Sequence, residues 1–169
     1  SDLFLDNKNP QLQICAYRAL RHAHSDGMLG WARRLSASKS PAVRREVAVS
    51  LRDVSYDDCK DILKPLFAGY DGKNRYYLEA LGTAVKGKEK AAYVDFVADS
   101  FGDPKSWTEI PKNLAWRLHT PKAIEALDMC ISAQSPGIGE FRHLAMSFAS
   151  FRNDADREDR KVRLANLGK

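Results

Sequence analysis

Apolar side chains recur along the chain in three- and four-residue steps, the spacing of one face of an α-helix. The stripes come in pairs, and the second pair repeats the first. The first helix of each pair carries Leu12, Ala16 and Leu20, then Val43, Val47 and Leu51. The second carries Met28, Trp31, Ala32 and Leu35, then Cys59, Ile62, Leu63 and Leu66. No segment alternates apolar and polar residues as a strand does, so the sequence predicts an all-α fold.

Five prolines follow a residue that can cap a helix, and each such pair predicts a helix start. A side-chain oxygen before the helix can accept from the free N–H groups of the first turn, and proline at the first position loses no hydrogen bond. The pairs are Asn9-Pro10, Ser40-Pro41, Asp103-Pro104, Thr120-Pro121 and Ser135-Pro136.

These starts recur with a period of 31–32 residues, through Pro10, Pro41, Gly72, Pro104 and Pro136, with Asp71 as the capping residue before Gly72. A constant period of this length is typical of stacked helical hairpins. We therefore expect one domain over residues 1–169, an α-α superhelix (a HEAT/armadillo-like solenoid) of about five two-helix repeats. Their expected bounds are 9–39, 40–70, 71–102, 103–134 and 135–169.

Two prolines depart from this pattern. Pro65 falls inside the second helix of the second repeat and should kink or end it. Pro111 indicates that the first helix of the fourth repeat starts late, after a longer connection that holds Trp107.

The candidate chemical groups favour a structural interpretation. Cys15, Cys59 and Cys130 lie among apolar neighbours and are expected to be buried, inert thiols. Two histidines, His22 and His24, are two residues apart and would point in different directions on a helix. Structural or solvent-facing roles are also expected for the other two histidines, His119 and His143. His119 is placed to close a helix, where a partial positive charge suits the helix dipole.

No motif for catalysis, for phosphate binding or for haem attachment occurs in the sequence. Gly137-Ile138-Gly139 lacks the preceding strand that a dinucleotide loop needs. No stretch approaches the ~18 apolar residues of a membrane helix. We expect no enzyme activity of this segment, no cofactor, no metal and no membrane insertion.

The net charge of +5 raises the question of nucleic acid. Taken by repeat, however, the excess lies only at the two ends: residues 1–39 carry +3, residues 135–169 carry +2, and the middle three repeats are neutral. A groove for a phosphate backbone needs consecutive basic rows, so this distribution argues against nucleic acid.

The alternative is a DNA-binding or DNA-alkylation-repair protein of the HEAT-like kind, with Trp31, Trp107 and Trp116 as candidate aromatic residues in its cleft. Trp31 and Trp116 lie on or beside apolar stripes, which favours packing for both.

Protein contact is the function that remains. The second helices of a solenoid usually line its binding surface. Their outward polar residues are the candidate contact face: Arg33, Arg34, Asp57, Lys60, Asp61, Lys64, Lys88, Lys90 and Asp95. An ordinary solvated helix surface is the other interpretation of this set.

Two segments, GYDGKNRYYLEALGTAVKGKE (69–89) and LAWRLHTPKAIEALD (114–128), are more distinctive. They resemble the helical-repeat portion of the membrane-bound dehydrogenase or PVC-type c-type-haem-binding family of large secreted bacterial proteins. In that family a β-propeller precedes the repeats and a cytochrome domain follows them. The resemblance implies a spacer or docking scaffold, excised from a periplasmic or secreted parent that is an oxidoreductase. It implies contact with neighbouring domains of that parent or with another protein, and assigns no active-site residue here.

Overall fold

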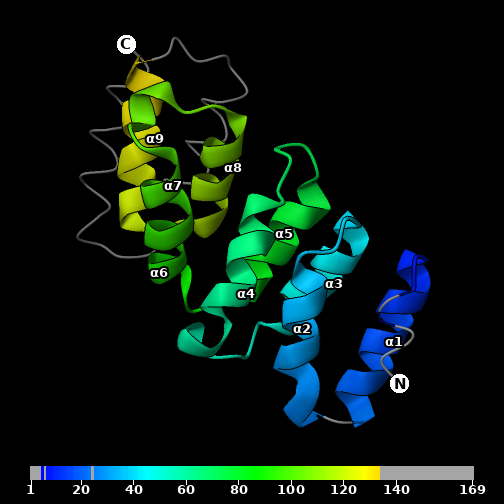
Figure 1. Ribbon diagram of the computed structural model, residues 1–169. Helices are drawn as coiled ribbons and strands as arrows, with labels where there is room; N and C mark the ends of the chain where they lie inside the picture. Colours follow the sequence, from blue (N-terminus) through cyan, green and yellow to red (C-terminus); the bar gives the residue numbers. More distant parts are fainter. Residues whose placement is uncertain (1–4, 6, 24, 134–169) are drawn as a thin grey trace. The chain divides into compact units, whose positions relative to one another are not determined.

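All regular structure in residues 5, 7–23 and 25–133, the part of the chain that the computed structural model describes, is helical. The all-α prediction is confirmed for this part, whereas the expected fifth repeat lies outside it. The chain divides into two compact units, Ser1–Ala92 and Tyr93–Lys169 (Figure 1).

The first unit contains five α-helices: α1 (Pro10–Ala23), α2 (Met28–Ser36), α3 (Pro41–Ser50), α4 (Tyr56–Ala68) and α5 (Arg75–Ala84), with a short 3-10 turn, η2 (Ser25–Gly27), before α2. The predicted starts at Pro10 and Pro41 are confirmed. Asn9 caps α1 by accepting from the Gln11 amide at 2.9 Å, but Ser40 makes no side-chain cap.

Helix α5 begins three residues later than the Gly72 that the period predicted. Asn74, not Asp71, is its cap, because the Asn74 side chain accepts from the Tyr77 amide at 3.0 Å. Asp71 instead accepts from the amides of Lys73 and Asn74, and these hydrogen bonds lower the pKa of its carboxyl group. Gly72 takes a positive φ of 78°, a conformation that glycine adopts without steric cost.

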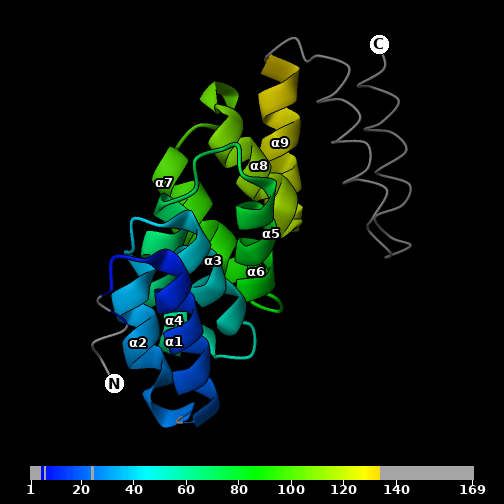
Figure 2. The same ribbon diagram turned by 90° about the vertical axis from the view of Figure 1, so that its right-hand side faces the viewer.

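The helices of the first unit form two layers: α1, α3 and α5 make the first layer, and α2 and α4 make the second (Figure 1). Helix α3 packs between α1 and α5, and α2 packs on both α3 and α4 (Figures 1 and 2). The predicted stripes of α2, α3 and α4 meet between the layers: Ala32, Leu35, Val43, Val47, Leu51, Cys59, Ile62, Leu63 and Leu66 are all buried. Burial of a Leu, Ile or Val side chain contributes about 1.5–3 kcal/mol, so this cluster is the main source of stability in the unit.

The stripe predicted for α1 is only partly correct, since Ala16 and Leu20 are half-buried but Leu12 is not. Leu12 is 44% exposed, and the buried residues of α1 are Ile14 and Tyr17. Helix α1 packs mainly on α3 and α2, so only the side chains directed toward those two helices lose their contact with water.

Polar side chains join the helices of the first layer. The Tyr17 hydroxyl donates to the Ser50 hydroxyl at 2.6 Å, and Ser50 in turn donates to the Val47 carbonyl. This places a hydrogen bond between α1 and α3 in a part-buried site. Burial raises the pKa of the Tyr17 hydroxyl, so it remains a donor at neutral pH.

Arg44 makes the corresponding link between α3 and α5. Its guanidinium donates to the Tyr77 hydroxyl at 3.0 Å, to the Ser38 carbonyl at 2.6 Å and to the Gly69 carbonyl at 3.0 Å. Tyr77 then donates to the Leu66 carbonyl at 2.8 Å. A Cβ on Gly69 would lie 2.7 Å from the Arg44 Nε, so glycine is needed for this approach.

The second unit is built around α8 (Glu109–Leu118) and α9 (Pro121–Ala133), which pack on each other. Before them, α6 (Glu89–Tyr93), whose residues up to Ala92 belong to the first unit, continues through a π-helical segment, η3 (Val94–Ala98), into α7 (Asp99–Phe101). A 3-10 turn, η4 (Pro104–Ser106), packs against α9. The predicted start at Pro121 is confirmed, while Pro104 begins η4 rather than a full helix.

The predicted effects of the two irregular prolines are partly confirmed. Pro111 lies in the first turn of α8, which starts late as expected and leaves Trp107 in the connection before it. Pro65 does not end α4 at its own position, since the helix continues to Ala68. The apolar side chains of α8 and α9 form the core of this unit, where Leu114, Leu118, Ala123, Leu127 and Ile131 are buried.

Replacing Arg44 with lysine should lower the free energy of unfolding by about 2 kcal/mol. Lysine cannot direct donors to three acceptors at once, so part-buried carbonyls lose charged hydrogen bonds. Urea unfolding followed by circular dichroism measures the change as a lower midpoint with an unchanged slope. The neighbouring exposed Arg45→Lys variant is the matched control, expected within 0.5 kcal/mol of the wild type, as is usual at the surface. Equal effects of both variants would contradict the role of Arg44.

Candidate protein-binding groove

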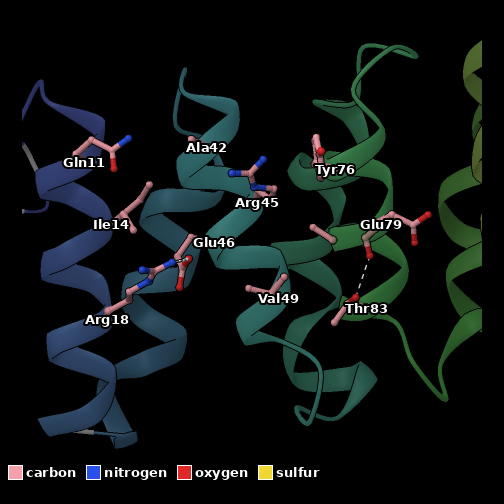
Figure 3. A pocket seen from close by; sticks show the side chains of 11 residues that line it. Gln11, Ile14, Arg18, Ala42, Arg45, Glu46, Val49, Tyr76, Glu79 and Thr83 are labelled. Carbon is pink, nitrogen blue, oxygen red and sulfur yellow. Dashed lines mark hydrogen bonds and ion pairs between the residues drawn. The ribbon is translucent and has the colours of Figure 1, made fainter.

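An open groove of about 650 Å³ runs across the exposed side of the first layer (Figure 3). Three helices line it. The lining residues are Gln11, Ile14 and Arg18 of α1, Ala42, Arg45, Glu46 and Val49 of α3, and Tyr76, Glu79, Ala80 and Thr83 of α5.

The lining residues occupy equivalent positions of successive helices. Ile14, Arg45 and Tyr76 are each 31 residues apart, and so are Arg18, Val49 and Ala80. Side chains at the same register of parallel neighbouring helices point to the same side of the layer. The period that predicted the hairpins therefore also aligns the rows of this groove.

Two ion pairs join α1 and α3 at Glu46. The Arg18 guanidinium lies 2.6 Å from the Glu46 carboxylate, and Arg21 lies 3.6 Å from the same carboxylate. The hydrogen bond that Arg18 donates to Glu46 raises the pKa of the Arg18 guanidinium. Because Arg18 is well exposed, the pair orients side chains more than it stabilises the fold.

The middle of the groove contains a cation and an aromatic ring. Arg45 of α3 has no ion pair with any residue that the structure describes. Tyr76 of α5 is 75% exposed, and Val49 is 39% exposed. A large aromatic side chain in water beside an arginine is typical of the residues that dominate protein interfaces.

Most of the predicted contact face is exposed, but it does not line this groove. Arg33 and Arg34 of α2, Asp57, Lys60, Asp61 and Lys64 of α4, Lys90 of α6 and Asp95 of η3 are all exposed. Asp95 belongs to the second unit and the others to the first. The contact role of this face stays a prediction.

Lys88, the ninth residue of that set, caps a helix. Its ammonium group donates to the carbonyls of Leu51 at 2.8 Å, Arg52 at 3.2 Å and Val54 at 2.7 Å. These carbonyls follow the C-terminus of α3, where a positive charge is favoured by the helix dipole and by acceptors that lack intrahelical donors. The three donors of Lys88 are therefore used within the fold.

A second hollow of about 760 Å³ lies where α1 and α3 begin. Arg34 contributes to it together with Lys8 and Lys39, and the remainder is lined by polar residues such as Asn7 and Gln13 and by apolar ones such as Leu35. Of the nine predicted contact residues, Arg34 alone lines either of these two hollows.

The predicted burial of the cysteines is correct for two of three. Cys59 and Cys130 are buried, and burial raises the pKa of the Cys59 thiol. Cys15 is exposed, which contradicts the prediction. The physical reason is the one that applies to Leu12: Cys15 lies on the side of α1 that faces away from α3 and α2. Within residues 5, 7–23 and 25–133, no group of three or more His, Cys, Asp or Glu could hold a metal ion.

His119 closes α8 as predicted, but not as a charged group. It takes a left-handed backbone conformation, with φ 53°, and its amide donates to the Ala115 carbonyl. Its ring packs edge-on against Trp116, with centroids 5.6 Å apart. Burial lowers the pKa of the imidazole, so the neutral form is favoured. His22 is exposed, and His24 and His143 lie outside the described residues.

No protein-family model, no curated protein and no solved structure matches this chain. Among the helices that the structure describes, none has the length and apolar character to cross a bilayer.

The groove residues were not selected from the sequence because their positions lie between the apolar stripes. The available signal was the same 31-residue period, applied to positions outside the predicted stripes. Ile14, Arg45 and Tyr76 fall in one such row, and the row ends in an aromatic residue that no stripe requires.

The pKa of His119 predicts a dependence of stability on pH. Its pKa in the folded chain lies below the unfolded value of about 6.5, so the unfolded state binds the proton first as the pH falls. The stabilising contribution is complete above about pH 6.5 and is lost as the pH falls through the lower folded-state pKa. Unfolding free energies at pH 7.5 and 5.0 should therefore differ less in a His119→Asn variant, since asparagine tolerates this backbone conformation. The same pH dependence in both proteins would contradict the assignment.

Proposed function

We propose that this chain is a non-catalytic helical-repeat scaffold that binds a protein partner in the groove of α1, α3 and α5. One observation carries the proposal: repeat-equivalent positions of three neighbouring helices line a single open groove that contains Tyr76 and Arg45. Stacked repeats commonly use such extended surfaces to bind proteins.

The finer architecture is part of the proposal, namely a HEAT-like superhelix of about five repeats. The packing of α3 on α1 supports it. The α3 residues Glu46 and Ser50 contact α1, and by the 31-residue period they are equivalent to Cys15 and Ala19. These two α1 residues are exposed. The exposed side of α1 thus has the register at which one more repeat of the same kind would pack.

The family context follows from the sequence resemblance alone. Residues 69–89 follow α4, form α5 and begin α6, and residues 114–128 end α8 and form most of α9. Under the proposal these helices belong to a spacer or docking segment of a periplasmic or secreted dehydrogenase- or cytochrome-type parent. A parent sequence with neither a propeller upstream nor Cys-x-x-Cys-His downstream would contradict this context.

The DNA-repair alternative gains nothing from the positions of its candidate tryptophans. Trp107 is 3% exposed, and its indole N–H donates to the Gly102 carbonyl. Trp116 packs on His119. Trp31 covers Gly27, where a Cβ would lie 2.8 Å from the ring. Each ring has a local packing role, and the groove has two glutamates among its lining residues beside its two arginines rather than a basic row.

Groove binding is testable with a random 12-residue peptide library displayed on phage and panned against the full chain. Peptides selected by the wild type should bind the Tyr76→Ala variant at least ten-fold more weakly, because the exposed ring supplies much of the apolar contact. Fluorescence anisotropy with the synthetic peptides measures this ratio. Phe101→Ala, which removes another exposed aromatic ring outside the groove, is the control and should change affinity less than two-fold. Equal affinity for Tyr76→Ala and the wild type would contradict the proposed site.

Nucleic acid is tested by a gel-shift titration with a 30-base-pair duplex at 50 and 200 mM salt. The proposed function predicts no shift at micromolar protein in either buffer. A complex at 50 mM salt that weakens more than ten-fold at 200 mM would show phosphate-driven binding and would favour the DNA-binding alternative.

A further inference from the structure

We infer that the groove of α1, α3 and α5 recognises a peptide segment in which a carboxylate side chain stands next to a bulky apolar one. The inference rests on the proposed function and adds the chemistry of the partner. Three features of the groove lead to it: the Arg45 guanidinium, the exposed apolar side chains beside it, and the common register of the two on neighbouring helices.

One charged group between α1 and α3 has no ion-pair partner among the described residues. Glu46 is the acidic residue there, and both Arg18 and Arg21 already contact its carboxylate. Arg45 is the third arginine, and it has no ion pair with any residue that the structure describes. The lining as a whole holds two arginines and two glutamates, so it carries no net charge, and the Arg45 guanidinium is the cation in it that a partner can neutralise. A carboxylate of the partner can accept two parallel hydrogen bonds from the Arg45 guanidinium.

The apolar surface lies beside this charge. Tyr76 and Val49 are exposed, and the two alanines of the groove, Ala42 and Ala80, leave room between the helices. Figure 3 shows Val49 on α3 and Tyr76 on α5, with Ile14 directed from α1 toward α3. A leucine, methionine or aromatic side chain of the partner would remove these surfaces from water.

The two kinds of surface occur at one register, which sets the spacing in the partner. Arg45 and Tyr76 are 31 residues apart and so occupy the same level of neighbouring helices. The acidic and apolar side chains of the partner must therefore reach adjacent points, as neighbouring residues of an extended segment or residues one helical turn apart do. A polyanion fits less well, because Glu46 and Glu79 also line the groove and would repel a continuous row of phosphates.

The phage selection tests this chemistry when it is repeated with a charge reversal. Peptides selected by the wild type should be enriched in Asp or Glu within four residues of a large apolar residue. Arg45→Glu should weaken a synthetic peptide of that kind at least ten-fold and should select peptides enriched in Lys or Arg instead. Arg33→Glu is the matched control: it makes the same charge change at an exposed position of α2 outside the groove and should alter affinity less than three-fold. Arg33 and Arg45 are both exposed, so both variants are expected to fold, and a thermal unfolding transition in each variant is the check.

The outcomes separate this inference from the proposed function. Peptides that lose affinity with Tyr76→Ala but show no acidic enrichment would overturn the carboxylate chemistry and leave the groove as the binding site. Peptides insensitive to Tyr76→Ala would overturn both. An equal loss with Arg33→Glu and Arg45→Glu would also overturn the inference, and would assign recognition to the predicted contact face that includes Arg33.

Discussion

The need to satisfy carbonyl groups at the end of α4 governs the arrangement of the first unit. The last carbonyls of a helix have no donor within the helix, and in a packed interior they must find one elsewhere. Tyr77 supplies it for Leu66, and Arg44 supplies it for Gly69 and also for Ser38 in the loop before α3. Because these donors come from α3 and α5, the hydrogen bonds that complete α4 also hold the first-layer helices together. Lys88 has a comparable role on the carbonyls after α3.

The groove is a consequence of this regular packing. Residues 31 apart lie level with one another only where neighbouring helices keep the same register, and the links from Tyr17 to Ser50 and from Arg44 to Tyr77 hold that register. Both links join residues 33 apart. A shift of one helix along its axis would separate Arg45 from Tyr76 and would divide the groove. The polar network beneath the surface thus determines which surface residues act together.

The distribution of charge within the groove bears on its use. Glu46 is held by two arginines, whereas Arg45 stands beside exposed apolar surface. Such a mixture favours a partner with both a charge and an apolar side chain over a uniform polyanion. Lys88 illustrates the opposite case. In sequence it is one of several cations on a helical segment, yet its ammonium group donates to three backbone carbonyls of the fold.

The sequence by itself determined the helical class, the starts of α1, α3 and α9, and most of the buried stripes of α2, α3 and α4. These depend on local physics: the 3.6-residue periodicity, the missing N–H of proline and the capping side chains act within a few residues of one another. The later start of α5 was missed because Asn74 and Asp71 are both good caps, and the choice between them depends on where Tyr77 packs. The exposure of Leu12 and Cys15, the neutral state of His119, the role of Lys88 and the groove itself were decided by tertiary structure. Each depends on which neighbour covers a side chain or accepts its hydrogen bonds, and such neighbours come from residues more than 30 positions away or from the opposite side of a helix, where periodicity alone assigns no partner.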